Sequence, residues 1–222
     1  MSDEISLIGL GRMGRNFAAN MMEHGIAVQA WDQSANVRTE VGTFLPNLPL
    51  SGDIEELTES LSPPRCVMLM VPSGDAVEQC LTTLSGLLGR GDVIIDCGNS
   101  HYHDTERRQD SLSNQGIHLL GLGVSGGLDG ARYGPSLMAG GPAAAWQRTG
   151  PLLETIAARA EGEPCAGYLG EGGAGHFIKI VHNGIEYAIM QILADVFDVL
   201  SQGCGMPAEE IAKTFHALNS GT

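Results

Sequence analysis

The chain has 222 residues, of which 43% are hydrophobic and 17% are charged, so a sizeable core can be buried and a disordered chain is excluded. Its formal net charge of −14 argues against nucleic acid and anionic membrane surfaces as partners, but leaves room for an anionic small molecule held by a few local cations. The five cysteines form no CxxC pair and no regular spacing, which is typical of reduced thiols in a cytoplasmic protein.

The amino-terminal segment is acidic and leads at once into an apolar run, so we expect no signal peptide. No apolar stretch approaches the roughly 18 residues that would cross a membrane. These features predict a protein of the cytoplasm that has no membrane partner.

Short apolar runs then alternate with longer helical patterns. Strands are predicted at Ile5–Leu10, Ala27–Asp32, Cys66–Val71, Val93–Cys97 and Ile117–Leu122, with edge strands at Ser136–Ala139 and 165–169 and helices near 12–24, 74–88 and 102–115. The stretch 40–64 is predicted to be irregular because four prolines interrupt it: Pro46, Pro49, Pro63 and Pro64. Continuous apolar strands that alternate with helices indicate a parallel sheet covered on both faces.

The pattern changes at Gly173, where a helix is predicted to run to about Ser201. Gly203 and Gly205 end it, and Pro207 opens a further helix near its first turn. The predicted fold is therefore α/β, with a Rossmann-type, doubly wound, mainly parallel sheet over 1–172. A helical segment over 173–222 follows, in which a long helix begins an all-α domain.

A glycine loop follows the first predicted strand and opens the first helix. Gly9 permits a tight turn, Gly11 lets a pyrophosphate approach the backbone, and Gly14 allows close packing of helix on strand. Leu10, Arg12 and Met13 complete the G-x-G-x-x-G motif, and the helix N-terminus supplies amide donors to the phosphates. The alternative is a structural turn without a ligand.

An acidic residue stands where the second predicted strand ends. Asp32 lies 18 residues after Gly14, where a carboxylate accepts hydrogen bonds from both hydroxyls of an adenosine ribose and repels a 2′-phosphate. Gln33 and Ser34 add no cation, so the pattern favours NAD over NADP. Arg12 and Arg38 are the nearby charges that would reverse this preference.

The predicted long helix carries polar residues close together on one side. At about 100° per residue, Lys179, His182, Asn183 and Glu186 fall within roughly 100° of one face. The other side is apolar, with Ile178, Val181, Ile185, Ile189, Ile192 and Val196. A solvated surface stripe would give the same pattern, so the helix alone leaves the role of these residues open.

Four segments carry a resemblance to a known family: "GLGRMGRNFAANM" (9–21), "GDVIIDCGNSHYHDTERR" (91–108), "GVSGGLDGARYGPSLMAGG" (123–141) and "GAGHFIKIVHNGIEY" (173–187). Over nearly all its length the sequence resembles the 6-phosphogluconate dehydrogenases. The wider β-hydroxyacid dehydrogenase group shares a related Ser-Gly-Gly turn and a lysine on the long helix. The His-Asn-Gly-Ile-Glu-Tyr continuation is similar to the 6-phosphogluconate branch.

The resemblance implies oxidative decarboxylation of 6-phospho-D-gluconate to ribulose 5-phosphate in the pentose phosphate pathway. It implies that Lys179 is the general base on the C3 hydroxyl and that Glu186 protonates the enediol left after loss of CO2. The two positions lie two helical turns apart, about 10 Å along the axis, and can address different carbons of an extended substrate. The polar stripe is then interpreted as the floor of an active site.

The resemblance also implies the residues that hold the sugar acid: Asn99, Ser125, Gly126, Gly127, His182, Asn183 and Tyr187. Asn99 would also face the cofactor, as would the loop Val71, Pro72 and Ser73. The structural alternatives are a plain turn at 125–127, a helix cap at Asn99 and an ordinary core residue at Tyr187. The remaining histidines lack metal-ligand spacing, so no metal site is predicted.

Two departures from the family pattern matter. NADP-using relatives typically carry Asn-Arg-Thr where this chain has Asp32, Gln33 and Ser34, which favours NAD. The family also continues well past residue 222, into a helical domain that supplies phosphate-binding residues and most of a dimer interface. The chain is therefore either a truncated form or a naturally short homologue, and we expect a homodimer through its helical segment.

Three hypotheses about activity stay open at this point. The first is an NAD-dependent 6-phosphogluconate dehydrogenase, and the second is a dehydrogenase of a related β-hydroxy acid, such as a sulfo-sugar acid or unphosphorylated gluconate. The third is a cofactor-binding remnant without turnover.

Overall fold

A computed structural model describes residues 4–221. Its main sheet has seven strands in the order β2-β1-β3-β4-β5-β6-β9. These are β1 (Glu4–Ile8), β2 (Ala27–Trp31), β3 (Cys66–Leu69), β4 (Val93–Asp96), β5 (His118–Ser125), β6 (Ser136–Gly140) and β9 (Ala166–Tyr168). Neighbouring strands are parallel except for β5 and β6, which are antiparallel. A small hairpin, β7 (Arg159–Ala160) and β8 (Glu163–Pro164), stands apart from this sheet.

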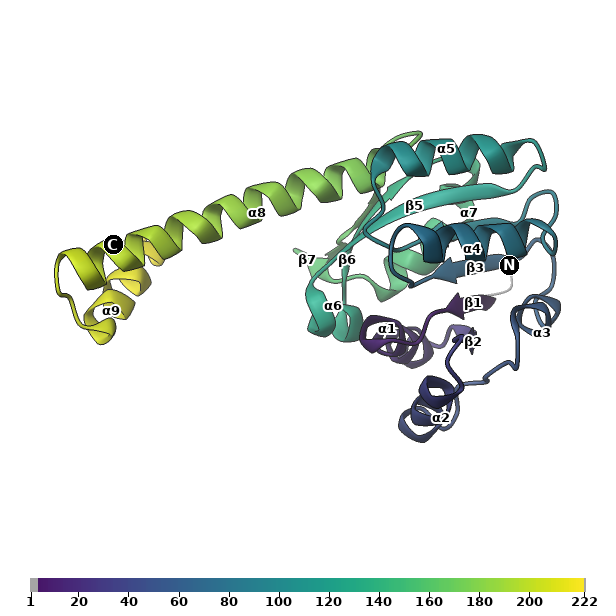
Figure 1. Cartoon of the computed structure of the whole chain (residues 1–222), viewed down its shortest axis with the longest axis horizontal. Coiled ribbons are helices and arrows are strands. Elements are labelled where there is room, and N and C mark those ends of the chain that lie inside the picture. Colours follow the sequence, from purple (N-terminus) through teal and green to yellow (C-terminus); the bar gives the residue numbers. More distant parts are fainter. Residues whose placement is uncertain (1–3, 222) are drawn as a thin grey trace. The chain divides into compact units, whose positions relative to one another are not determined.

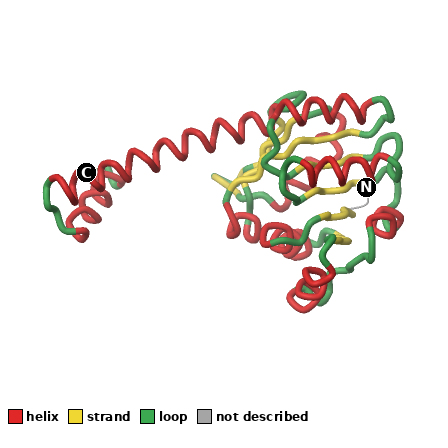
Figure 2. Tube along the Cα trace, in the orientation of Figure 1, coloured by secondary structure: helices red, strands yellow, loops and turns green. Residues whose placement is uncertain are grey.

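Helices cover the sheet on both faces (Figures 1 and 2). One face packs on α1 (Arg12–Glu23), α2 (Ala35–Phe44), α6 (Gly127–Tyr133) and α7 (Ala143–Ile156), and the other on α3 (Ile54–Glu59), α4 (Asp75–Ser85) and α5 (Tyr102–Ser113). Successive side chains of β3 enter the two cores in turn, Cys66 and Met68 on one side and Val67 and Leu69 on the other. This confirms the predicted doubly wound, mainly parallel sheet.

The remaining elements are helical. They are α8 (Ala174–Asp198), a π-helical segment η1 (Val199–Gly203) and α9 (Ala208–Asn219), which has Pro207 at its N-cap. The long helix is confirmed, although its regular α-helical part ends three residues before Ser201. The chain divides into two compact units, the first ending at Lys179 and the second beginning at Ile180, so α8 belongs to both. Within residues 4–221, no helix has the length and apolar character needed to cross a membrane.

The stretch 40–64 was wrongly predicted to be irregular, because α2 ends inside it and α3 lies within it. The prolines all lie outside these helices, and side chains cap both N-termini. The Asp53 carboxylate accepts a hydrogen bond from the Glu56 amide at 2.8 Å, and the Glu56 carboxylate accepts one from the Gly52 amide at 2.6 Å. This reciprocal capping pattern, Asp53 followed by Glu56, is a local signal that would have predicted α3.

Two further predictions need correction. The strand at 136–139 is not at an edge, since β6 lies between β5 and β9 with Leu137 and Ala139 buried. Of the two predicted edge strands only β9 is at an edge, and β2 forms the opposite edge of the sheet. Helix α7 was not predicted, because Gly150 and Pro151 lie inside it and both disfavour helix interiors. A Cβ atom on Gly150 would lie 2.8 Å from the Trp146 ring, so this glycine makes room for the indole.

Candidate functional site

The glycine loop between β1 and α1 is a closely packed turn. Gly9 has φ +98°, and a Cβ atom there would lie 2.4 Å from the Met70 carbonyl oxygen. A Cβ atom on Gly14 would lie 1.9 Å from the Gly9 carbonyl oxygen, whereas one on Gly11 would meet open space. Gly9 and Gly14 are therefore required by the fold, and Gly11, the N-cap of α1, leaves exposed backbone that a ligand can approach.

Asp32 is held in place at the end of β2. Its Oδ2 accepts a hydrogen bond from the Leu10 amide at 2.8 Å, and its Oδ1 accepts one from the Ser34 amide at 2.9 Å. The carboxylate therefore ties the glycine loop to the start of α2, and each oxygen keeps a lone pair for a further donor. Arg38 donates from Nη1 to the Asp32 backbone carbonyl at 2.5 Å, which orients its guanidinium beside this site.

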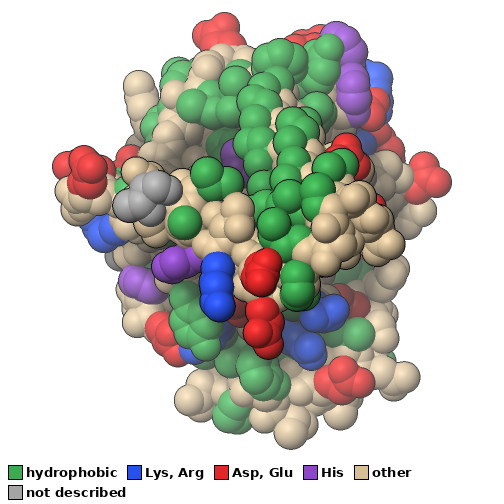
Figure 3. All heavy atoms as spheres, turned by 90° about the vertical axis from the view of Figure 1, so that its left-hand side faces the viewer, with side chains coloured by type: hydrophobic (Ala, Val, Ile, Leu, Met, Phe, Trp, Pro, Cys, Tyr) green, Lys and Arg blue, Asp and Glu red, His purple; other side chains and the backbone are tan. Residues whose placement is uncertain are grey.

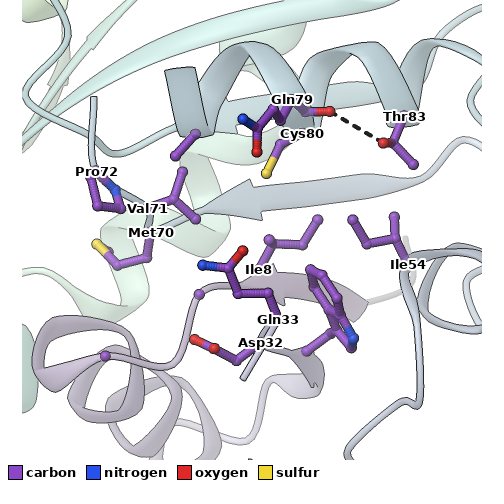
Figure 4. Close-up of a pocket in the computed structure, with 14 residues that line it drawn as sticks. Ile8, Asp32, Gln33, Ile54, Met70, Val71, Pro72, Gln79, Cys80 and Thr83 are labelled. Atoms are coloured by element: carbon purple, nitrogen blue, oxygen red, sulfur yellow. Dashed lines mark hydrogen bonds between the residues drawn. The ribbon is translucent and has the colours of Figure 1, made fainter. Parts of the chain in front are cut away.

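A cavity of about 340 Å³ opens where the glycine loop, Asp32 and α4 meet (Figure 4). The structure brings together six of the predicted cofactor residues in its wall: Gly9, Gly11, Asp32, Gln33, Val71 and Pro72. Five others lie within two positions of these residues in the sequence but do not line the cavity: Leu10, Arg12, Met13, Ser34 and Ser73. Gly14 and Asn99 do not line it either. Most of the cavity wall is apolar, as ligand pockets usually are.

Sequence reasoning missed the other residues that line this cavity. They are Ile8, Trp31, Ile54, Met70, Ala76, Gln79, Cys80 and Thr83. Trp31 donates from Nε1 to the Gly52 carbonyl at 3.0 Å, so its ring is fixed. Burial raises the pKa of the Cys80 thiol to about 11, so this side chain is a neutral wall group. The available signals were the strand ends and the spacing of Ala76, Gln79, Cys80 and Thr83, which places these four residues on one side of α4.

The loop that follows β4 is built around a buried carboxylate. Asp96 accepts hydrogen bonds from the Gly98 amide at 2.9 Å and from the Ser100 hydroxyl at 2.7 Å. Asn99 is exposed within this turn, and the N-cap of α5 is His101, so the alternative that Asn99 caps that helix is wrong. A Cβ atom on Gly98 would lie 3.2 Å from the Val71 carbonyl oxygen, so the loop directly contacts the segment that lines the cavity.

The first turns of α8 lie directly on the sheet along a seam of glycines. A Cβ atom on Gly175 would lie 2.5 Å from the Gly121 carbonyl oxygen of β5 and 2.3 Å from the Met138 carbonyl oxygen of β6. A Cβ atom on Gly123 would lie 2.7 Å from the Lys179 Cβ atom. Lys179 is only 8% exposed, so the glycine seam fixes the base of this side chain on β5.

The Ser-Gly-Gly turn continues the same strand. Ser125 ends β5, Gly126 is the N-cap of α6 with φ +117°, and Gly127 begins α6 with φ +61°. Ser125 is half-buried, and both glycines are exposed. Because Gly123 contacts Lys179 two residues earlier on β5, the first unit brings this turn and Lys179 to the same end of one strand.

The other predicted substrate residues belong to the second unit. His182 Nδ1 lies 3.7 Å from the Glu186 carboxylate and 3.3 Å from Asn183 Oδ1. Tyr187 is 64% exposed, so the alternative that it is a core residue is wrong. His182, Asn183 and Glu186 lie close together on α8, as the helical wheel predicted, and Tyr187 follows Glu186 in the sequence.

The apolar side chains of the second unit's part of α8 are also exposed. They include Ile180, Val181, Ile185, Ile189, Met190, Ile192, Leu193, Val196 and Phe197, each at least 40% exposed. We call these residues the apolar face of α8. In the space-filling view, hydrophobic side chains gather in a broad green band (Figure 3).

His176 is a buried polar residue that sequence reasoning did not single out. It lies one turn before Lys179 on α8, is 1% exposed, and its Nδ1 is 2.7 Å from the Thr105 hydroxyl of α5. Burial lowers the pKa of its imidazole, while the negative charge of Asp96 acts in the opposite direction. The available signal was its spacing, since residues three apart on a helix lie on neighbouring positions of one side.

Family models match both parts of the chain. Residues 4–170 match the NAD binding domain of 6-phosphogluconate dehydrogenase, and residues 175–222 match the 6-phosphogluconate dehydrogenase C-terminal domain.

Curated relatives are similar over almost the whole chain. The decarboxylating 6-phosphogluconate dehydrogenase of Schizosaccharomyces pombe is 43% identical over 98% of this chain and 45% of its own length. The NAD(+)-dependent, decarboxylating 6-phosphogluconate dehydrogenase of Bacillus subtilis is 44% identical over 100% of this chain and 48% of its own length. The chain therefore spans about half the length of the curated relatives it matches.

A solved structure has the same fold. The 6-phosphogluconate dehydrogenase of Plasmodium falciparum, described in its apo form and in complexes with NADP+ and with 6-phosphogluconate, superposes with a TM-score of 0.92. The sequences are 33% identical, and the match covers 98% of this chain and 47% of that one.

Proposed function

The chain belongs to the 6-phosphogluconate dehydrogenase family, and on that premise we propose that it supplies the cofactor site and catalytic helix for oxidative decarboxylation of 6-phospho-D-gluconate to ribulose 5-phosphate. The observation that carries this proposal is the placement of Lys179. The glycine seam fixes it on β5, at the strand end that also carries the Ser-Gly-Gly turn.

In the proposed mechanism, Lys179 takes the proton of the C3 hydroxyl as general base. The nicotinamide cofactor, when bound, supplies the acceptor for the hydride that leaves C3. The resulting β-keto acid loses its C1 carboxylate as CO2, and the electrons of the broken bond form an enediol. Glu186, which lies 3.7 Å from His182 Nδ1, then gives its proton to the carbon that carried the carboxylate, which becomes C1 of ribulose 5-phosphate.

The substrate contacts are also proposals. We assign the sugar acid to Asn99, Ser125, Gly126 and Gly127 of the first unit, and to His182, Asn183 and Tyr187 of the second. Exposed backbone at Gly126 and Gly127 would let a carboxylate approach the N-terminus of α6.

We propose NAD as the preferred cofactor. Both Asp32 oxygens are already oriented by backbone amides, so the carboxylate is positioned to accept hydrogen bonds from ribose hydroxyls and to repel a 2′-phosphate. Arg38 is engaged by the Asp32 backbone carbonyl, which limits its reach toward such a phosphate. Among the relatives, the Bacillus subtilis enzyme is named as NAD(+)-dependent, whereas the Plasmodium falciparum structure was described with NADP+.

Three features of organisation complete the proposal. The boundary between the dinucleotide-binding domain, 1–172, and the helical segment, 173–222, falls between the two matched family models, which end at 170 and begin at 175. A homodimer would cover the apolar face of α8, since a large exposed apolar patch is unusual for a soluble monomer. A cytoplasmic setting is supported by five unpaired cysteines.

The deciding experiment incubates the chain with NAD and 6-phospho-D-gluconate and follows NADH and CO2. We expect both products from the parent chain and neither from Lys179→Met, with NADH binding kept within about twofold because Lys179 does not line the cofactor cavity. Unphosphorylated gluconate and a sulfo-sugar acid serve as competing substrates. Turnover of one of these in place of the phosphorylated acid would refute the proposed substrate, and cofactor binding without any turnover would identify a remnant.

A further inference from the structure

A buried arginine of α5, Arg108, holds the loop 96–100 through hydrogen bonds. Arg108 is 2% exposed and donates from Nη1 to the Ser100 hydroxyl at 2.9 Å and to the Asp96 carboxylate at 3.3 Å. Its Nε donates to the Glu78 carboxylate of α4 at 3.0 Å. The turn that presents Asn99 is therefore tied to α5 by charge-assisted hydrogen bonds that water does not reach.

The same helix is tied to α8 one turn earlier, at Thr105. Thr105 is fully buried, and its hydroxyl lies 2.7 Å from Nδ1 of His176. A Cβ atom on Gly121 would lie 2.8 Å from the Thr105 methyl group and 2.9 Å from His176 Nδ1, so this strand glycine makes room for the pair. Because a larger residue at position 121 would displace both side chains, the packing of β5 depends on the contact between Thr105 and His176.

The imidazole of His176 also lies near the loop 96–100. Its Nε2 is buried and has no hydrogen bond of regular geometry within residues 4–221. The backbone of Asp96 and of Gly98 nevertheless lies close enough to favour a proton on the ring, although burial outweighs this and lowers the pKa. The Thr105 hydroxyl donates to the His101 carbonyl at 3.4 Å and shares a hydrogen bond with Nδ1, and the ring lies beside the backbone of Asp96 and Gly98, so His176 contacts both α5 and the loop.

We propose that His176 is a positioning residue: together with Thr105, it holds the loop 96–100, and with it Asn99, in register with the turn of α8 that carries Lys179. This inference rests on the proposed function, because it assigns Asn99 to the nicotinamide end of the cofactor. In a doubly wound sheet the adenosine lies over the strands that carry Gly9 and Asp32, and the nicotinamide lies toward the other half, here β4 and β5.

The test compares two ligands that share the adenosine and pyrophosphate but differ at the nicotinamide. ADP-ribose reports the glycine loop and Asp32, whereas NADH also reports the Asn99 loop. We expect Thr105→Val and His176→Phe to weaken NADH binding about tenfold, the loss of one buried hydrogen bond, and to leave ADP-ribose within about twofold of the parent. Titration calorimetry gives both dissociation constants.

Two matched variants separate positioning from folding. Thr105→Ser keeps the hydroxyl and should restore the parent ratio of NADH to ADP-ribose affinity, and His176→Asn keeps a polar group near the Nδ1 position and should restore part of it. If His176→Phe does not fold, the Thr105→Val and Thr105→Ser pair decides.

If Thr105→Val leaves the ratio of NADH affinity to ADP-ribose affinity unchanged, this inference is wrong and the proposed function is not affected. That outcome includes the case in which both affinities stay the same and the case in which both decrease equally. A parent chain that binds neither ligand overturns the proposed function and this inference with it.

Discussion

The central strands β3 and β4 of the first unit are buried on both faces, whereas the helices of the second unit leave most of their apolar side chains in contact with solvent. Met68, Leu69, Ile94 and Ile95 are each 0% exposed. By contrast, the apolar face of α8 is at least 40% exposed along its length. The first unit encloses enough apolar surface to order its cofactor cavity by itself, while the second unit carries apolar side chains that need another surface.

The same contrast separates the glycines of the two units. In the first, added Cβ atoms at Gly9, Gly14 and Gly175 would collide with backbone atoms, so these positions hold the fold together. In the second, Gly184 and Gly203 have open space around the site of a Cβ atom. Among the described glycines, the close approaches to backbone thus all lie in the first unit, which also has open positions such as Gly11, whereas those of the second unit have only open surroundings.

The largest effect is expected where packing is tightest. Gly14→Ala places a methyl group 1.9 Å from the Gly9 carbonyl oxygen, and should destabilise the first unit by about 3 kcal/mol or more, since backbone has to move. Gly11→Ala meets open space and should leave the melting temperature unchanged while weakening NADH binding at least about tenfold, because its methyl group occupies the path of the pyrophosphate. Thermal melts and NADH titrations check both. A stable Gly14→Ala variant would contradict the contrast drawn here.

Such local constraints are what the sequence could predict. The glycine loop, Asp32 and the buried strands follow from short-range patterns, and their positions in the structure agree with the prediction. The pairing of β6 between β5 and β9, the helix around Gly150 and Pro151, and the Thr105–His176 contact depend on residues far apart in the chain. Thr105 and His176 are separated by 71 positions, and no periodicity within either helix reports their meeting.

A second, smaller effect concerns cofactor choice in the first unit. Asp32→Asn combined with Gln33→Arg removes the charge that repels a 2′-phosphate and adds a cation beside it, so preference should shift toward NADP by about tenfold to a hundredfold, as for a hydrogen bond to a charged group. The parent should bind NAD more tightly than NADP. Dissociation constants for the four combinations decide this, and equal constants for the two cofactors in the parent would refute the proposed role of Asp32.

The third prediction tests the unpartnered surface of the second unit. If the apolar face of α8 meets a second copy, the chain should sediment as a dimer at micromolar concentration. Ile189 is 53% exposed, and Ile189→Lys would place a charge in the dimer interface. This substitution should raise the dissociation constant of the dimer at least about tenfold. Lys213→Ala, on α9, is the matched surface control. A parent chain that sediments as a monomer would show that this face does not join two copies.

The smallest effect is expected at Gly184, inside α8 and between two proposed substrate residues. Alanine there meets no neighbouring atom and removes the flexibility of a glycine in a helix interior, so it should stabilise this part of α8 by up to about 1 kcal/mol. A stabilisation of about 1 kcal/mol corresponds to about fivefold, so hydrogen exchange of the backbone amides after residue 184 on α8 should slow by up to about fivefold. The same substitution at Gly123 should do the opposite, since its methyl group would lie 2.7 Å from the Lys179 Cβ atom and push α8 off the sheet. If both variants changed exchange in the same direction, close packing would not be what distinguishes the glycines of the two units.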